Sequence, residues 1–550
     1  MKQINPIIKL DYPDPDVIRV GNTYYMVSTT MYFMPGCEIL RSYDLVHWEH
    51  ASYVYDRLDS TKRQTLEGKE NAYGNGMWAA SLRHHDGRFY ICFVANDTHK
   101  TYLYTSKNIT GPWEKSEISG FYHDSSILFD DDGKVYIVYG NREIHITELD
   151  LEKKAPKEGG LDKIIVKDSD DAPLGYEGSH FYKINGKYYI FFIHIPASTG
   201  KRTESCFVSD RPEGPYYGRD ICDDDRNYRG MGVAQGGVVE SPKGNWYGIF
   251  FQDSGAVGRI PVLVPITWQN IEKDNLGPGL TEDSYPFPVV GDMGKIPECF
   301  EIEKLNLSYT YAPLVGSDDF SVRSIAGHNE LLSDSFGMRS FWQYNHEPEL
   351  SLVSKCHDDN GKNYIKITTG KLSNNLVQAK NTLTQRCMFP GCAASVCING
   401  ENLKNGDYAG LCILESAYAF IALTRKNDEY YVVMCSREIS DKGIWGERND
   451  DEAPKELASV KLDSPVLKLS ANVCFDEASA KESFTKYTAG DDTVRFSFTP
   501  EQKLSETRLG PAKKLQFLLD HFTGARFGLF VYSTIETGGS AYFSDFTYET

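Results

Sequence analysis

The amino-acid sequence predicts an all-β protein, a five-bladed β-propeller followed by a β-sandwich. In the first half, a short turn containing glycine precedes an aromatic-rich, alternating stretch five times over. Such turns are strong signals for β-hairpins, and helical periodicity is almost absent there. In the second half, short strands such as Tyr430–Met434 are punctuated by Asn-Gly turns, a spacing typical of a sandwich.

The five turns mark the expected blades. They are Gly21-Asn22, Asp86-Gly87, Asp132-Gly133, Asn185-Gly186 and Lys243-Gly244. Repeats of roughly 45–65 residues, each a small antiparallel sheet, indicate a propeller. We therefore expect the propeller over residues 1–297, a linker over 298–316 and the sandwich over 317–550.

Composition limits the function and the partners. The chain has 550 residues, 41% hydrophobic and 13% aromatic, with a formal net charge of −19. This charge argues against nucleic acid and anionic membranes as partners and is compatible with a neutral substrate. The segment Met1–Pro6 has no apolar signal region, and the twelve cysteines are scattered, so we expect a reducing cytoplasm. The oligomeric state is left open.

Three carboxylates occupy equivalent places in their blades. Asp14 stands between Pro13 and Pro15, which stiffen its backbone. Like Asp124 and Glu177, it lies about one strand upstream of the hairpin turn of its blade. Because equivalent positions of different blades face one axis, we expect these three side chains to meet near the centre of the propeller.

The segments that carry these carboxylates resemble glycoside hydrolase family 43. The resemblance covers the first half of the chain and rests on residues 5–16, Asn75–Ala80 and the surroundings of Asp124 and Glu177. The second half resembles the sandwich of the xylosidase-like members, notably at Ala379–Arg386. The resemblance implies a five-bladed propeller and hydrolysis with inversion.

The resemblance also implies a role for each carboxylate. Asp14 would be the general base, Glu177 the general acid, and Asp124 would raise the pKa of the acid and orient it. The chemistry requires such a set, because an inverting glycosidase needs a protonated carboxyl and an ionised one about 6.5–9.5 Å apart, with a water between them. A third carboxylate raises the pKa of the acid by like-charge repulsion.

Further positions are expected to bind the sugar. Arg259 stands where the family places an arginine that hydrogen-bonds the terminal sugar. Trp78 and Phe33 are expected to form the hydrophobic wall of the pocket, a role that suits aromatic rings. Gln235 takes the place of a histidine that family members often carry near the axis, so we do not expect a metal anchored by that histidine.

Other residues are assigned structural or metal-binding roles. Asp16 either raises the pKa of Asp14 or points outward. His123 and His180 are interpreted as hydrogen-bonded structural histidines. Asp319 and Asp545 lie near the two ends of the sandwich and are candidates for a structural calcium site. No cofactor is expected to be required.

These observations predict an exo-acting, inverting glycosidase that releases terminal β-D-xylose or α-L-arabinofuranose from plant-derived oligosaccharides. Two alternatives stay open. One is an endo-acting arabinanase, which would have an open cleft instead of a pocket. The other is a carbohydrate-binding propeller without turnover, and the presence of Asp14, Asp124 and Glu177 argues against it.

Overall fold

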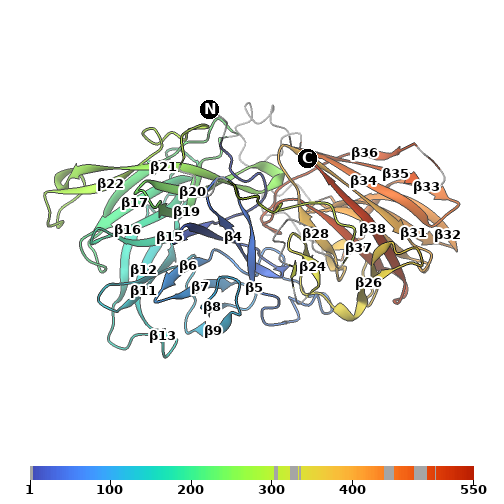
Figure 1. The fold of residues 1–550 in the computed structure, drawn as a ribbon, viewed down its shortest axis with the longest axis horizontal. Coiled ribbons are helices and arrows are strands. Elements are labelled where there is room, and N and C mark those ends of the chain that lie inside the picture. Colours follow the sequence, from blue (N-terminus) through green and yellow to red (C-terminus); the bar gives the residue numbers. More distant parts are fainter. Residues whose placement is uncertain are drawn as a thin grey trace.

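In the computed structural model of this chain, two β-sheet domains lie side by side (Figure 1). The structure describes residues 4–228, 230–302, 308–321, 332–333, 336–438, 451–475, 492–501, 503 and 505–550. Strands dominate, with four 3-10 turns at Gly255–Val257, Lys273–Asn275, Leu350–Leu352 and Leu376–Gln378 in the described residues. No helix in those residues is long and apolar enough to cross a membrane.

The first domain consists of five antiparallel sheets that follow one another along the chain. The first two are β1 (Asp16–Val20), β2 (Thr23–Ser28), β4 (Gly36–Ser42) and β5 (Glu49–Tyr55), then β6 (Ser81–His85), β7 (Arg88–Ala95), β8 (Lys100–Ser106) and β9 (Glu114–Ile118). The third is β10 (Ser126–Phe129), β11 (Val135–Asn141), β12 (Glu143–Asp150), β13 (Ala155–Pro156) and β14 (Asp162–Lys167). The last two are β15 (Leu174–Ile184), β16 (Lys187–Ile195), β17 (Thr203–Ser209) and β18 (Tyr217–Cys222), then β19 (Val233–Glu240), β20 (Trp246–Asp253), β21 (Arg259–Glu272) and β22 (Ser284–Val290).

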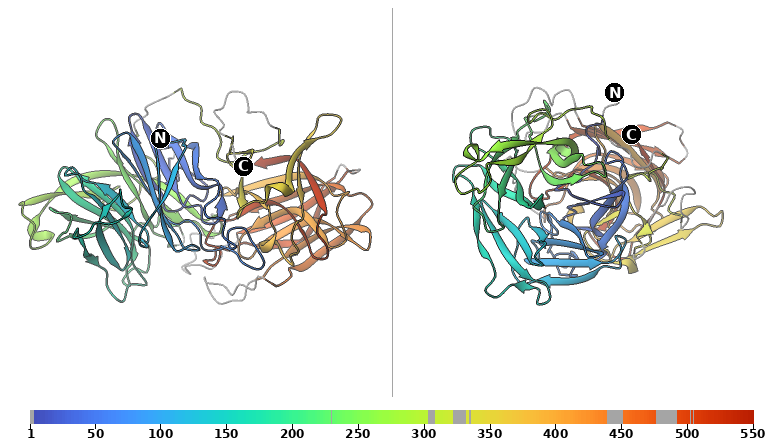
Figure 2. Two further views of the ribbon diagram at one scale, coloured as in Figure 1. Left: turned by 90° about the horizontal axis from the view of Figure 1, so that it is seen from below. Right: turned by 60° about the vertical axis from the view of Figure 1, so that its left-hand side comes forward.

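The five sheets are the blades of a propeller. Their first strands, β1, β6, β10, β15 and β19, contact one another in a closed ring in which β19 returns to β1. In the right-hand view of Figure 2 the blue to green blades surround a common centre. Asn5 helps to close the ring, since its side chain donates to the Leu263 carbonyl at 2.7 Å and accepts from the Leu263 N–H at 2.9 Å. The predicted five-bladed propeller is confirmed.

The second domain is a sandwich of two sheets. One has the order β3-β25-β28-β37-β30-β31-β32-β33, and the other β26-β27-β38-β29-β34-β35-β36. The strands of the first sheet are β3 (Phe33–Met34), β25 (Gln343–Asn345), β28 (Leu383–Arg386), β37 (Arg526–Ser533), β30 (Asp407–Leu414), β31 (Ala419–Lys426), β32 (Glu429–Ser436) and β33 (Lys455–Leu462). Those of the second are β26 (Val353–His357), β27 (Asn363–Thr368), β38 (Ser540–Glu549), β29 (Gly391–Asn399), β34 (Val466–Cys474), β35 (Thr493–Pro500) and β36 (Thr507–Lys514), while β23 (Leu332–Ser333) and β24 (Met338–Arg339) form a separate hairpin.

Alternating side chains explain the sandwich. In β34, Leu467, Leu469, Ala471 and Val473 are buried, whereas the residues between them are more exposed. Because successive side chains of a strand point to opposite faces, this pattern gives the sheet one apolar face. The apolar faces of the two sheets pack together, which confirms the predicted sandwich.

The two domains share one hydrophobic core. It joins Met34 and Tyr55 of the propeller to Trp342, Leu383 and Leu411 of the sandwich. Strand β3, which lies between β2 and β4 in the chain, pairs with β25 and so belongs to a sandwich sheet. The last propeller strand ends at Val290; the exact limits of the linker stay a prediction.

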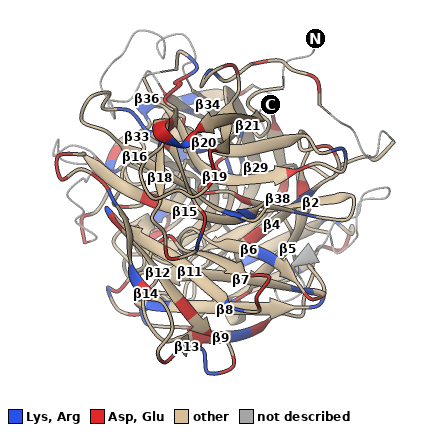
Figure 3. Cartoon of the chain, turned by 90° about the vertical axis from the view of Figure 1, so that its left-hand side faces the viewer, with Lys and Arg blue, Asp and Glu red and all other residues tan. Residues whose placement is uncertain are grey.

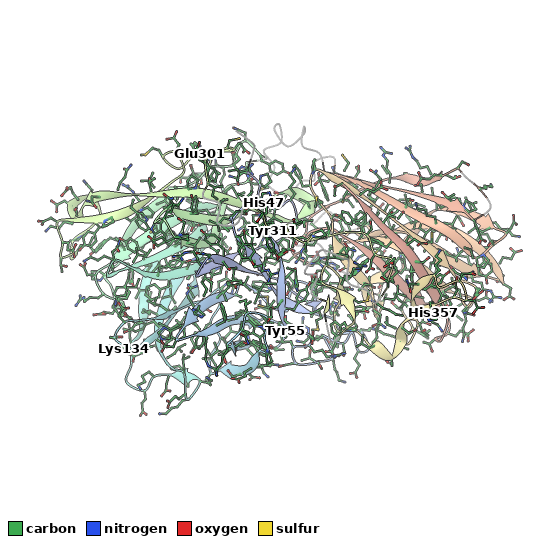
Figure 4. All side chains as sticks on the ribbon, in the orientation of Figure 1. His47, Tyr55, Lys134, Glu301, Tyr311 and His357 are labelled. Atoms are coloured by element: carbon green, nitrogen blue, oxygen red, sulfur yellow. The ribbon has the colours of Figure 1, made fainter. Side chains whose placement is uncertain are left out.

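The connecting segment packs against the first blade. The ring of Tyr311 stacks on His47 with centroids 5.7 Å apart, and Figure 4 labels both residues. The hydroxyl of Tyr311 accepts from the backbone N–H of Tyr43 at 2.8 Å. The connecting segment is therefore fixed to the propeller by specific contacts.

Figure 3 shows acidic and basic segments interspersed over the propeller side of the molecule.

Candidate active site

Asp14 lies at the start of the first blade with its carboxylate held on both oxygens. Thr29 Oγ1 donates to Oδ2 at 2.8 Å, and Arg259 Nη1 donates to Oδ1 at 2.6 Å. The backbone of Asp14 is in the left-handed region, with φ of 51°, a conformation that aspartate tolerates better than most residues. The side chain is therefore buried, ionically paired and fixed in orientation.

Asp124 and Glu177 come from the third and fourth blades. Asp124 precedes β10, and its backbone carbonyl accepts from the Ser179 N–H at 3.2 Å, which ties the two segments together. Glu177 lies within β15, where the pairing with β16 shifts register on either side of it. Such bulges re-aim side chains near active sites, and here both carboxyl groups face the same cavity.

A cavity of about 350 Å³ contains these carboxylates. It is lined by Asp14, Gly74, Trp78, Asp124, Pro173, Leu174, Glu177, Ile195, Arg202, Gln235 and Arg259 of the propeller, and by Leu519 and Phe522 of the sandwich. The cavity therefore brings together six of the predicted site residues, which are Asp14, Asp124, Glu177, Arg259, Trp78 and Gln235.

Phe33 is not part of this cavity, which corrects the expectation that it forms the wall. It is 1% exposed, and its strand pairs with β25. The guanidinium of Arg526 lies 3.7 Å from its ring centroid. Phe33 therefore packs between the domains. Phe522 lines the cavity together with Trp78; its ring lies 5.5 Å from the Trp78 ring and 4.3 Å from the guanidinium carbon of Arg259.

Sequence reasoning missed the sandwich loop that carries Leu519 and Phe522. Asp11 anchors this loop, because its two carboxylate oxygens accept from the N–H of Arg259 at 2.7 Å and of Gly524 at 2.8 Å. The Ala525 N–H donates to the Ala256 carbonyl at 2.8 Å. The sequence places Asp11 three residues before Asp14, but it does not reveal the partners of this carboxylate.

His123, which the sequence predicts to be a structural residue, lies between two of the carboxylates. Its Nε2 atom is 3.8 Å from Asp124 Oδ2 and 3.6 Å from Glu177 Oε2. Burial lowers the pKa of His123, but the negative charges of Asp124, Glu177 and Asp14 outweigh burial and raise it to about 9. The imidazole is therefore a cation at neutral pH.

The pKa values of Asp124 and Glu177 are shifted in opposite directions. Burial and the charges of Glu177 and Asp14 raise the pKa of Asp124 to about 7, against the opposing effects of His123 and Arg259. Burial also opposes ionisation of Glu177, but His123, Arg202 and a hydrogen bond from Asn141 Nδ2 outweigh it and hold its pKa below the usual value. This reverses the expectation that Glu177 has the raised pKa, and the cause is His123.

Asp16 neither points outward nor pairs with Asp14. It is fully buried, with Arg83 Nη1 at 2.7 Å, the Leu82 N–H at 2.8 Å and His180 Nδ1 at 3.2 Å. Burial opposes its ionisation, but Arg83 and His180 outweigh burial and lower its pKa. Asp16 therefore links blades one, two and four, and His180 has the structural role that was expected.

Each of the two candidate calcium ligands faces a cation among the described residues. Asp319 faces Arg339 Nη2 at 3.4 Å, and Asp545 faces Lys362 Nζ at 2.7 Å. Calcium requires several oxygen ligands around one point, whereas these two carboxylates are each paired with a different cation. The described contacts of this pair therefore do not fit a shared calcium ion.

Comparison with known proteins agrees with this architecture. Residues 4–271 match the model of glycosyl hydrolases family 43, and residues 334–549 match that of the beta xylosidase C-terminal concanavalin A-like domain. A beta-xylosidase from Formosa agariphila is 28% identical over 326 residues, 52% of this chain and 54% of that protein. A non-reducing end alpha-L-arabinofuranosidase from Bacteroides ovatus is 28% identical over 333 residues, 56% of this chain and 60% of that protein.

A solved structure is similar over both domains. It is the bifunctional GH43-CE protein from Bacteroides eggerthii, with 35% sequence identity and a TM-score of 0.83, and the match covers 100% of this chain and 64% of that one. The chain thus spans between 54% and 64% of the length of these three proteins. Because one family model matches the propeller and the other matches the sandwich, the protein belongs to glycosyl hydrolases family 43.

Proposed function

We propose that this glycoside hydrolase is exo-acting and inverting, and that it releases a terminal β-D-xylose or α-L-arabinofuranose from plant-derived oligosaccharides. The observation that carries the proposal is one cavity that holds Asp14, Asp124 and Glu177 and has a wall from each domain. The two sugars are those named for the relatives from Formosa agariphila and Bacteroides ovatus. They present similar hydroxyl layouts, so one small site can accept both.

In the proposed reaction, Asp14 is the general base. Thr29 and Arg259 hold its two oxygens, so that its carboxylate can orient a water and take a proton from it as the water attacks the anomeric carbon. Glu177 is the general acid that gives a proton to the leaving oxygen. The bond from the anomeric carbon to that oxygen breaks as the bond to water forms, which inverts the centre in one step.

In our proposal, Asp124 holds the proton that is used in the acid step. With the pKa of Asp124 at about 7 and that of Glu177 lowered, the pair retains a proton on Asp124 near neutral pH. This proton passes to Glu177, and Glu177 gives it to the leaving oxygen. The transfer is favourable because negative charge develops on the leaving oxygen, which makes this oxygen the best proton acceptor. The proton taken up by Asp14 then returns to the pair through solvent.

The loop that contains Leu519 and Phe522 supports the exo assignment. An endo-acting enzyme needs an open cleft in which the polymer continues on both sides of the cleaved bond. Here the sandwich lines one side of the cavity, and Asp11 fixes the loop to the propeller. This arrangement favours a pocket for a terminal sugar over a through-running cleft.

Two measurements test the proposal. A panel of nitrophenyl glycosides should show turnover of the β-xyloside, the α-arabinofuranoside or both. Proton NMR during the first minutes of β-xyloside hydrolysis should then show α-xylose before mutarotation equilibrates the anomers. Release of β-xylose first would refute the roles of Asp14 and Glu177, because retention proceeds through a covalent intermediate and a carboxylate pair about 5 Å apart. Cleavage of internal bonds in linear arabinan would favour the endo alternative.

A further inference from the structure

A further carboxyl group, that of Glu204, is buried next to Gln235, one of the residues that line the cavity. Glu204 lies in β17 of the fourth blade and is 0% exposed. Its Oε2 accepts the backbone N–H of Gln235 at 2.8 Å. Among the described residues, Oε1 has no hydrogen-bond partner and the side chain forms no ion pair. Burial raises the pKa of Glu204 well above its ordinary value, which favours the uncharged form of the carboxyl group.

The partner of Glu204 is the bulged residue of β19. Pairing between β19 and β20 shifts register between Ala234 and Gly236, so the Gln235 N–H does not bond to the neighbouring strand. The φ of Gln235 is 58°, an uncommon value for a residue other than glycine, and such strain persists only when surrounding contacts hold it. Glu204 supplies that contact, and the bulge turns the Gln235 side chain toward the cavity.

The Gln235 side chain in turn packs against the backbone beside the acid. At Gly178, whose φ is 63°, an added Cβ would lie 2.6 Å from Gln235 Cδ. The next residue, Ser179, donates its N–H to the Asp124 carbonyl at 3.2 Å. The segment that follows Glu177 is therefore held by Gln235 on one side and by Asp124 on the other.

We propose that Glu204 is a positioning residue for the hydrolytic reaction: it fixes the bulge at Gln235, and through Gln235 it fixes the backbone that carries Glu177. The inference rests on the proposed role of Glu177 as the general acid. A site of this kind must hold its groups within about 0.5 Å of the productive geometry. Loss of the Glu204 contact would therefore act on proton donation more than on binding.

The test compares Glu204→Gln with Glu204→Ala and Glu204→Asp. Glutamine keeps the acceptor oxygen at the same reach and mimics a neutral carboxyl, so we expect kcat on xylobiose or an arabino-oligosaccharide within about 3-fold of wild type. Alanine removes the acceptor oxygen, and aspartate has a side chain too short to bring it to the Gln235 N–H. We therefore expect kcat on these substrates to fall by about 10- to 100-fold in both variants. On nitrophenyl glycosides, whose leaving group needs little protonation, the loss should stay below about 5-fold.

Asp407→Ala is the matched control. Asp407 is a fully buried carboxyl of the sandwich that accepts the Lys404 N–H at 2.8 Å, and it is not among the residues that line the cavity. We expect it to lower the thermal midpoint without changing the ratio of activities on the two substrate types. If Glu204→Ala does not fold, Glu204→Asp, which leaves a smaller cavity, carries the same comparison.

Three outcomes would overturn the proposal. Equal losses on both substrate types would make Glu204 a merely structural residue. A loss in Glu204→Gln as large as in Glu204→Ala would mean that its ionised form matters. A crystal structure of Glu204→Ala or Glu204→Asp with Gln235 and residues 177–179 unmoved would remove the physical link, whereas a shift of about 0.5 Å or more would support it. If wild type cleaves no pentoside, the proposed function fails, and the crystal structures still decide the positioning role.

Discussion

The two domains contribute different things to one cavity. Among the described residues, the propeller supplies every ionisable group that lines it. Hydrogen bonds hold these groups, as Arg259 of the fifth blade and Thr29 of the first blade hold Asp14. The sandwich supplies Leu519 and Phe522, two apolar side chains on a loop. The propeller therefore provides the groups that can take part in the reaction, while the sandwich provides part of the apolar wall that shapes the site.

The largest expected effect tests the propeller side. Glu177→Ala should lower kcat on natural oligosaccharides by about 10²- to 10⁴-fold, the usual contribution of a general acid. Activated nitrophenyl glycosides should be partly spared, because their leaving group departs without full protonation. Steady-state kinetics on both substrate types measure this. Equal losses would show that Glu177 is not the acid.

The next effect tests the sandwich side. Phe522→Ala removes the ring that lies 5.5 Å from Trp78 and 4.3 Å from the guanidinium carbon of Arg259. We expect kcat/KM to fall roughly 10- to 100-fold, the range for one apolar contact in a pocket, with the selectivity between natural and activated substrates unchanged.

The matched control for Phe522 is Phe517→Ala, in the same loop. Phe517 is 6.1 Å from Phe522 and is not among the residues that line the cavity. Its replacement should leave kcat/KM within about 3-fold of wild type. If both variants lose activity to the same extent, the loop acts through its overall fold and not through the Phe522 ring.

The smallest effect concerns stability. The pKa of Asp124 is raised from 3.8 to about 7, mainly by burial. A raised pKa means that the folded state binds the proton more tightly, so the stabilisation is present below pH 3.8 and is lost as the pH rises to about 7. Asp124→Asn cannot ionise and avoids this loss. It should be more stable than wild type by roughly 1–3 kcal/mol at pH 8 and equally stable near pH 4.

Denaturant unfolding at the two pH values measures this difference. Asp130→Asn is the control, because Asp130 pairs with Lys183 and Tyr188, and its pKa is lowered even though burial opposes this. It should be less stable than wild type at pH 8. A stability difference for Asp124→Asn that does not change with pH would contradict the raised pKa.

The sequence revealed the propeller side of the site because that side is repetitive. Asp14, Asp124 and Glu177 precede or begin their blades at similar offsets from hairpin turns, so the repeat itself places them at one axis. The sandwich loop that contributes Phe522 lies outside this repeat, so no repeated spacing indicates its position. Phe522 reaches the cavity through the docking of two domains and the Asp11 anchor, and neither is encoded by spacing.

The errors have physical causes as well. Phe33 looks like a pocket aromatic in the sequence, but the backbone pairing of its strand with β25 draws it into the domain interface. The charge of His123 depends on Asp124, its neighbour in the chain, and on Glu177, which it meets only in the fold. Asp319 and Asp545 each meet a cation that the sequence pattern could not indicate.

Strand β3 has a consequence for self-association. An unpaired sheet edge offers free N–H and C=O groups, and these are a template for another polypeptide to add as an extra strand. In this protein Phe33 and Met34 occupy the β25 edge of the eight-stranded sheet, pairing with Asn345 and Tyr344. The folded propeller thus acts as a built-in blocker of intermolecular strand addition at that edge.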